Sequence, residues 1–289
     1  MKMNHKNFSF VFFGTPRFAA LVLEPLLREG FYPSVIICNP DRIAGRKRIL
    51  TKPAVKILGE ARKIKIWQPE SLSVADFKKE VGEIDFAVVA AYAKIIPQNI
   101  LSLPRLGTIG VHPSLLPKYR GASPIQSAIL GGEQSTGVTL YLMDEKVDHG
   151  STLANGKLSL YERSPEGRQI ANSDTYQMLE ENLAKLGGEL LAKTIPDFVA
   201  GKIVPKEQNH SEATFTKKFV TADGEVDVTK DDPEMIYRKI RALNPEPGVY
   251  TFTYPKYEGK RVKLLAAKFE EGKLRITEIQ VEGRKAQRI

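Results

Sequence analysis

The sequence has very little cysteine: Cys38 is the only one among 289 residues. One thiol excludes an internal disulfide and any zinc site built from several cysteines. Long apolar runs are missing as well. The apolar stretch over residues 8–13 contains Ser9 and stops at Gly14-Thr-Pro, so it is too short for a signal-peptide core or a membrane span. We therefore expect a cytoplasmic protein, and we expect no metal in its site.

The fingerprint of dinucleotide-binding proteins is also missing. Gly14 follows the first apolar run, as a phosphate-binding glycine would, but no Gly-x-Gly-x-x-Gly pattern follows it. Without the second and third glycines a pyrophosphate cannot approach the backbone closely. The sequence thus argues against NAD(P) as a cofactor.

Acidic residues are outnumbered, and the formal net charge is +9. Residues 41–65 hold nine Lys and Arg against two Asp and Glu, and residues 235–289 hold thirteen against six. Two separated basic segments suggest a polyanion that lies across the molecule. Solvated, lysine-rich surface is the alternative for either segment alone.

In the first part of the chain, short apolar runs alternate with helical patterns. This alternation predicts an α/β fold with a Rossmann-like parallel sheet. Expected strands lie at 8–13, 35–38, 64–67, 85–91, 108–112 and 138–143, and expected helices at 16–29, 53–62, 73–80 and 123–130. A long amphipathic helix at 174–200 should be interrupted or ended near Gly187-Gly188 and Pro196, because these residues disfavour helix interiors.

A polar, irregular stretch predicts a linker at 201–212, between a catalytic domain at 1–200 and a C-terminal domain at 213–289. The C-terminal part is rich in strand patterns, at 249–254, 261–269 and 273–281, after one helix at 233–243 that Asp231-Asp-Pro233 caps. This spacing fits a small β-barrel of the oligonucleotide-binding (OB) type.

Two short motifs carry candidate chemistry. His112 ends an apolar run, and Asp148 lies in an Asp-x-Gly that follows a later strand, so the two could form a proton-transfer pair. Pro113 and Pro117 forbid a regular helix or central strand and shape a loop just after the histidine. From composition alone His-Pro and Asp-x-Gly are both common in turns, and Asp144 is a rival carboxylate.

The complete pattern resembles the signature of the enzymes that transfer a formyl group from 10-formyltetrahydrofolate to an amine. That signature is Asn-x-His-x-Ser-Leu-Leu-Pro, followed by Met-Asp-x-x-x-Asp-x-Gly. His112, the run 114–117, Met143-Asp144 and Asp148-x-Gly150 match it. One position departs from it, because Gly110 stands where the family has its catalytic asparagine.

The resemblance implies the roles of the matching residues. His112 and Asp148 would be catalytic, with Asp148 preferred over Asp144 because the family's carboxylate precedes x-Gly. The co-substrate 10-formyltetrahydrofolate would bind along the loop formed by Ser114, Leu115, Leu116 and Pro117. The other histidines, His5, His149 and His210, have no counterpart in the signature and are interpreted as background.

Further strings are similar to methionyl-tRNA formyltransferases and extend the resemblance over nearly the whole chain. They lie at 12–19, 39–46, 53–56, 68–70, 90–97, 120–126, 213–215, 223–224 and 240–248. The resemblance implies a monomer that acts on methionyl initiator tRNA. A basic loop would enter the acceptor arm, and the basic C-terminal domain would hold the tRNA backbone. The loop residues concerned are Arg42, Arg46, Lys47 and Arg48.

Two alternatives stay open. A formyltransferase for another amine, or a formylfolate hydrolase, would share the signature but would not need the basic loop. A tRNA-binding homologue with impaired catalysis is suggested by Gly110, because losing one oxyanion donor typically costs on the order of 10²–10³ in kcat. A water or a backbone amide could instead fill the gap at Gly110.

Overall fold

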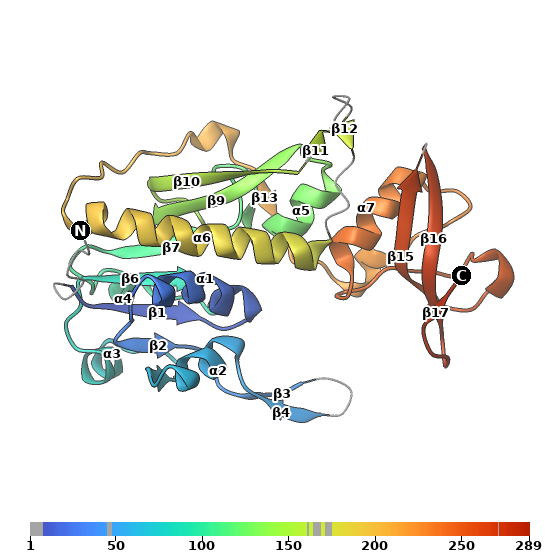
Figure 1. Ribbon diagram of the computed structural model, residues 1–289. Helices are drawn as coiled ribbons and strands as arrows, with labels where there is room; N and C mark the ends of the chain where they lie inside the picture. Colours follow the sequence, from blue (N-terminus) through green and yellow to red (C-terminus); the bar gives the residue numbers. More distant parts are fainter. Residues whose placement is uncertain (1–7, 45–47, 161, 164–168, 171–174, 271) are drawn as a thin grey trace. The chain divides into compact units, whose positions relative to one another are not determined.

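The structure is a computed structural model that describes residues 8–44, 48–160, 162–163, 169–170, 175–270 and 272–289 (Figure 1). The chain forms two compact units. Unit 1 comprises Met1–Arg120, Gly137–Leu158 and Glu181–Thr214, and unit 2 comprises Gly121–Thr136, Ser159–Glu180 and Phe215–Ile289.

A seven-stranded sheet organises unit 1, with the strand order β10-β9-β7-β6-β1-β2-β5. Its strands are β1 (Phe10–Gly14), β2 (Val35–Ile37), β5 (Lys65–Trp67), β6 (Phe86–Ala90), β7 (Thr108–His112), β9 (Ser135–Leu142) and β10 (Thr152–Ser159). The five strands from β7 to β5 are parallel to one another, and β9 is antiparallel to β7. The predicted α/β architecture with a mostly parallel sheet is confirmed.

The central strands are apolar throughout because both faces of the sheet are covered. β1 and β6 are buried along their whole length, and the rings of Phe10 and Phe86 stack with centroids 5.0 Å apart. The helices associated with this sheet are α1 (Arg17–Arg28), α2 (Ala54–Ala61), α3 (Val74–Glu80), α4 (Gln98–Leu101) and α6 (Tyr176–Val199). Strand order reverses between β1 and β6, and ligands of such sheets bind beyond the carboxyl ends of the strands at this point.

Helix α6 runs without a break through Gly187 and Gly188, so the predicted interruption there was wrong. A Cβ on Gly187 would lie 3.0 Å from Cγ1 of Val111, and one on Gly188 would lie 2.4 Å from the carbonyl oxygen of Val22. The two glycines therefore let α6 pack tightly against the sheet and against α1. This packing outweighs their low helix propensity. Pro196 lies in the last turn of the helix.

Unit 2 contains α5 (Pro124–Leu130), α7 (Pro233–Leu243) and an antiparallel sheet. The sheet comprises β14 (Tyr250–Thr251), β15 (Val262–Glu270), β16 (Lys273–Val281) and β17 (Gln287–Arg288), in that linear order. The predicted strand-rich C-terminal domain is confirmed, and its paired strands are antiparallel, while closure into a barrel of the OB type stays a prediction. Helix 233–243 is also confirmed, and the carboxylate of its N-cap Asp232 accepts from the backbone N–H of Met235. Ser123 is the N-cap of α5, but its side chain makes no capping hydrogen bond.

The remaining elements are short. They are β3 (Arg42–Ala44), β4 (Ile49–Thr51), β8 (Arg120–Gly121), β11 (Glu162–Arg163), β12 (Gln169–Ile170), β13 (Phe215–Thr216) and the 3-10 turns η1 (His210–Glu212), η2 (Thr221–Gly224) and η3 (Pro255–Tyr257).

Residues 201–212, predicted as a linker, lie in unit 1. The backbones of Lys206 and Thr152 exchange two hydrogen bonds of 2.8 Å, and Gln208 is buried. None of the described helices combines the length and apolar character that crossing a membrane requires.

Candidate active site

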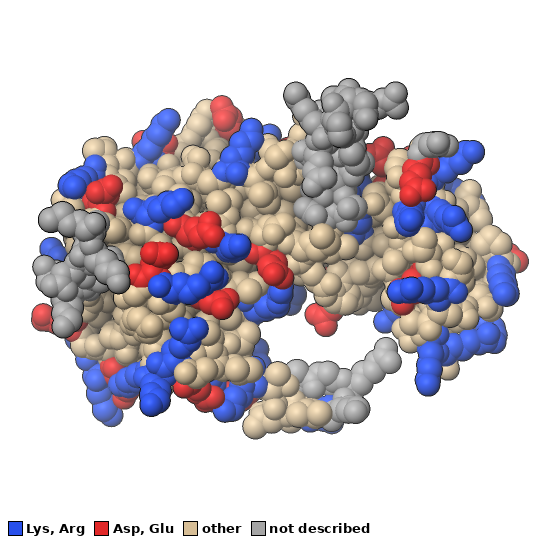
Figure 2. All heavy atoms as spheres, viewed as in Figure 1, with Lys and Arg blue, Asp and Glu red and all other residues tan. Residues whose placement is uncertain are grey.

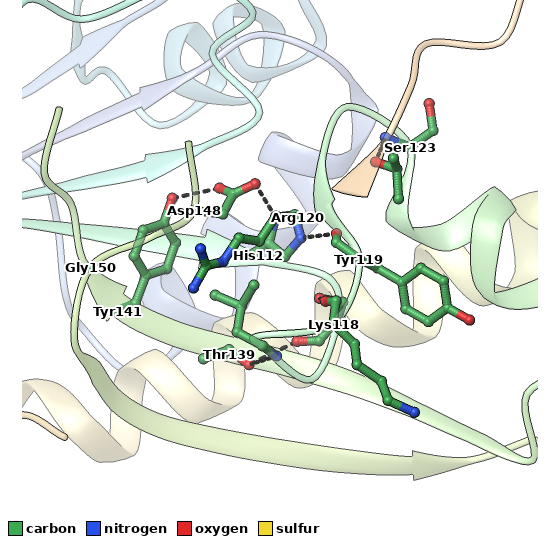
Figure 3. A network of polar contacts seen from close by, with 12 residues as sticks. His112, Lys118, Tyr119, Arg120, Ser123, Thr139, Tyr141, Asp148 and Gly150 are labelled. Carbon is green, nitrogen blue, oxygen red and sulfur yellow. Dashed lines mark hydrogen bonds and ion pairs between the residues drawn. The ribbon is translucent and has the colours of Figure 1, made fainter. Parts of the chain in front are cut away.

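His112 is the last residue of β7, and its side chain is almost fully buried. Its Nε2 lies 2.8 Å from the carbonyl oxygen of Tyr119 (Figure 3). A carbonyl can only accept, so Nε2 carries the proton of this hydrogen bond. The other ring nitrogen, Nδ1, lies 3.4 Å from Oδ2 of Asp148. The structure thus brings the predicted pair together, with Nδ1 of the imidazole facing the carboxylate.

Two residues of this arrangement have left-handed backbone conformations. Tyr119 has φ 60° and Asp148 has φ 49°. Positive φ is uncommon for residues other than glycine, and such strain concentrates at functional sites. The strain falls on the residues that supply the two partners of the His112 ring.

Gly150 explains the glycine of the Asp-x-Gly motif. A Cβ on it would lie 1.8 Å from the carbonyl oxygen of Leu142. Only glycine therefore allows the loop to return so closely along β9. This return carries Asp148 to the end of β7, which distinguishes the motif from an ordinary surface turn.

Gln208 and Arg120 fix the same loop, and the motif analysis gave neither a role in the site. The Gln208 amide donates to the backbone carbonyls of Asp148 and Gly150, at 2.9 and 2.8 Å. Its Oε1 accepts from Nη2 and Nε of Arg120, at 2.7 and 3.2 Å. Both side chains are buried. Arg120 lies in a string that matches the family, whereas Gln208 lies in the expected linker and gave no signal.

Gly110 lies in the middle of β7, directly opposite Tyr141 of β9. The Tyr141 hydroxyl donates a 2.7 Å hydrogen bond to Oδ1 of Asp148. Figure 3 shows this phenol on one side of the carboxylate and the His112 ring on the other. Sequence reasoning did not identify Tyr141, which lies in an apolar strand where an aromatic residue is expected to belong to the core.

The loop predicted to bind the co-substrate divides into inward and outward parts. Ser114 is fully buried, and its hydroxyl donates a 2.6 Å hydrogen bond to the carbonyl of Lys118. Leu115 packs against β9, because a Cβ on Gly137 would lie 2.5 Å from its Cδ2. Leu115, Leu116 and Pro117 are all partly exposed. Ser114 therefore holds the loop in shape from inside, and the three partly exposed side chains can contact a ligand.

Asp144, the rival carboxylate, has a different partner. Its Oδ2 lies 2.7 Å from Nδ1 of His149, whose ring stacks on that of His210 with centroids 4.0 Å apart. His210 in turn accepts from Arg120 at 2.9 Å. These two histidines, interpreted as background from the sequence, therefore connect Asp144 to Arg120 beside the site. The geometry favours Asp148 as the partner of His112.

The basic loop contains a β-hairpin, in which β3 pairs with β4. Arg42 and Arg48 are exposed on it, while Arg46 and Lys47 lie outside the described residues. Lys56 at the following helix forms an ion pair with Asp41, and hydrogen bonds from Lys56 and Gln68 lower the pKa of that carboxyl. Part of the positive charge of this segment is thus neutralised where the hairpin begins, whereas Arg42 and Arg48 are exposed to solvent.

Unit 2 presents a second cationic surface. Figure 2 shows more Lys and Arg than Asp and Glu over its C-terminal strands. A cavity of about 360 Å3 beside Tyr254 and Tyr257 lies on this unit, and Lys256 and Arg284 stand over the Tyr257 ring at 5.7 and 5.6 Å. The exposed cations of the C-terminal segment are Lys256, Lys260, Lys268, Lys273, Arg275, Arg284, Lys285 and Arg288.

The chain matches a known protein family over most of its length. Residues 6–195 match the family described as formyl transferase, and residues 218–273 match its C-terminal domain. The chain belongs to the formyl transferase family. Members of the family include the methionyl-tRNA formyltransferase of Caldanaerobacter subterraneus subsp. tengcongensis, 38% identical over 94% of this chain and 92% of its own length. That of Thermotoga maritima is 39% identical over 84% and 74%.

Solved structures share the family fold at lower identity. Methionyl-tRNA formyltransferase from Clostridium thermocellum superposes with a TM-score of 0.61, at 17% identity, over 95% of this chain and 98% of its own. An N-formyltransferase from Helicobacter canadensis, in complex with folinic acid and dTDP-3-aminofucose, gives 0.64 at 19% identity, over 91% and 89%. Within the part of this chain that the structure describes, no three His, Cys, Asp or Glu side chains gather as a metal site.

Proposed function

We propose that the protein transfers the formyl group of 10-formyltetrahydrofolate to the α-amine of methionyl initiator tRNA. The His112–Asp148 pair at the end of β7 is the observation that carries this proposal. The relatives that are 38–39% identical over most of the chain are methionyl-tRNA formyltransferases, which supports the choice of acceptor.

The reaction requires a proton transfer from the attacking amine, but it does not require a strong base to generate that amine. A free α-amine has a pKa near 8, so a useful fraction is neutral and nucleophilic at cell pH. Its attack on the formyl carbon gives a tetrahedral intermediate whose nitrogen must lose a proton while its oxygen gains charge. His112 and Asp148 together accept that proton, and the imidazolium formed beside the carboxylate stabilises the developing oxyanion. Collapse of the intermediate would then break the bond between the formyl carbon and N10 of the co-substrate, and the same proton would pass to N10, so that tetrahydrofolate leaves as a neutral amine. Burial of the His112 side chain and partial burial of the Asp148 side chain strengthen these interactions.

The folate co-substrate would lie along the outer part of the loop, at Leu116 and Pro117. The carboxyl ends of β7 and β6 meet there, on the edge where α/β sheets bind their ligands. Ser114 would act on the co-substrate indirectly, by holding the loop in shape through its hydrogen bond to Lys118.

The tRNA would contact both units. Arg42 and Arg48 on the β3–β4 hairpin suit the phosphates of an acceptor stem, and the cationic strands of unit 2 suit the rest of the backbone. Aromatic rings bordered by cations, as at Tyr257, provide a surface on which an unstacked base can lie. Action on initiator tRNA would place the protein with the translation machinery in the cytoplasm.

The test is formation of formylmethionyl-tRNA from 10-formyltetrahydrofolate and charged initiator tRNA. We expect product with the wild-type protein, and a loss of about 10²–10⁴ in rate for both His112→Asn and Asp148→Asn. Glu145→Gln is the matched control, because Glu145 is an exposed carboxylate in the same loop. Absence of product from wild type at high concentration, with tRNA still bound, would remove the proposal.

A formyltransferase for sugar amines is the second candidate, because the protein from Helicobacter canadensis has a similar fold. It predicts formylation of a nucleotide-linked amino sugar without tRNA. The same assay with such a sugar as acceptor distinguishes the two.

A further inference from the structure

The space beside Gly110 is filled by the ring of Tyr141. A Cβ placed on Gly110 would lie 2.3 Å from Cε1 of that ring, 2.5 Å from Cζ and 2.8 Å from the hydroxyl oxygen. Gly110 has an ordinary strand conformation, so the glycine is not needed for an unusual φ. A glycine inside a strand then marks a close approach by another group. A side chain on residue 110 and the present position of Tyr141 exclude each other.

The phenol is placed to act on the catalytic carboxylate. Its hydroxyl donates to Oδ1 of Asp148 at 2.7 Å, and Oδ2 of the same group faces Nδ1 of His112 at 3.4 Å. A carboxylate whose two oxygens have different partners cannot rotate without breaking one contact (Figure 3). Tyr141 is 3% exposed.

Burial raises the pKa of Tyr141 well above its ordinary value, and the neighbouring charge of Asp148 raises it further. The hydroxyl therefore stays protonated at neutral pH and remains a donor. It cannot serve as the base of the reaction. Its contribution must come through the group that accepts its hydrogen bond.

We propose that Tyr141 is a positioning residue for formyl transfer, which holds Asp148 toward His112, and that Gly110 is the residue that admits it. The inference rests on the proposed function and adds a residue to its site. The missing side chain at residue 110 thus leaves no empty space in the site, because Tyr141 of the opposite strand places its hydroxyl there.

The central experiment compares Tyr141→Phe with wild type in single-turnover formylation. Losing a hydrogen bond to a charged group should lower the rate about ten- to hundredfold, while KM for folate and for tRNA stays within about twofold. Tyr92→Phe is the matched control. Tyr92 is also buried in unit 1, and its hydroxyl has no hydrogen-bond partner among the described residues. Thermal unfolding of both variants checks that they fold.

A double-mutant cycle separates positioning from general structural damage. Since Tyr141 acts through Asp148, adding Tyr141→Phe to Asp148→Asn should change the rate by less than about twofold. Fully additive losses, or a Tyr141→Phe rate equal to an active wild type, would overturn the inference.

The 15N signals of the His112 ring report its contact with Asp148 without any turnover. They should shift in Tyr141→Phe and stay in place in Tyr92→Phe. If the wild type forms no formylated product, the proposed function is wrong. The ring signals still show, without turnover, whether Tyr141 holds Asp148 toward His112. Unchanged signals in Tyr141→Phe overturn it in either case.

Discussion

Nη2 of Arg120 donates a 2.7 Å hydrogen bond to Oε1 of Gln208, and this contact joins the loop after β7 to a segment that follows the long helix α6. The amide nitrogen of Gln208 continues the chain of contacts to the carbonyls of Asp148 and Gly150. The loop that carries Asp148, the proposed catalytic carboxylate, is therefore held by residues outside the two signature motifs.

We predict that Gln208→Leu lowers kcat about tenfold or more, because it leaves Arg120 and two carbonyls without their buried partner. The exposed neighbour Glu207, changed to Gln, is the control. Single-turnover rates and thermal unfolding are the measurements. A Gln208→Leu protein as fast and as stable as wild type would show that the loop needs no such support.

Gly110→Asn should lower the rate, although it would restore the residue of the family signature. The new side chain would meet the Tyr141 ring, and such overpacking typically costs about 1–3 kcal/mol of stability. Combining it with Tyr141→Leu frees the space, so the double variant should be faster than Gly110→Asn alone. Gly110→Ala crowds the ring in the same way without an amide. A faster Gly110→Asn single variant would mean that the site lacks a donor and that Tyr141 does not replace it.

Charge reversal of Arg42 and Arg48 to Glu should weaken tRNA use and spare folate binding. Each lost phosphate contact should reduce the slope of log tRNA affinity against log salt concentration by about one unit. Lys52→Gln is the control, since Lys52 forms an ion pair with Glu60 at 2.8 Å. The measurements are KM for tRNA and its slope against salt concentration. Weaker folate binding with unchanged tRNA kinetics would contradict the assignment of the hairpin.

Asp85 links stability to pH. A hydrogen bond from the backbone N–H of Ser9, and then one from Arg105, lower the pKa of this carboxyl. A lowered folded pKa stabilises the fold above the unfolded value of about 3.9, and this contribution is lost as pH falls through the folded pKa. Asp85→Asn should therefore lower Tm at pH 7, and its difference from wild type should narrow as pH falls below about 5 and close only below the folded pKa. The exposed Glu83→Gln should show no such closing, and a constant Asp85→Asn difference would contradict the linkage.

The sequence by itself determined the parallel sheet, helix α7 and the two motifs. Apolar runs such as that in β1 are long enough to bury both faces of a strand, and Asp232-Pro233 starts a helix by local chemistry alone. His112 and Asp148 could be singled out because a family signature surrounds them. The local pattern did not show that β3 and β4 form a hairpin, since each strand has only three residues and too few positions for an alternating pattern.

Only the tertiary structure decided which residues outside the matched positions of the two motifs support the fold and the site. Gly187 and Gly188 have low helix propensity, and close packing against Val111 and Val22 was needed to keep α6 continuous. Gln208 lies in a stretch without periodicity, and its role depends on Arg120, to which no spacing rule relates it. The reason for a glycine at position 110 lies in the opposite strand, because pairing of β7 with β9 places Tyr141 against it. Contacts of this kind join residues far apart in the chain, so no local pattern contains them.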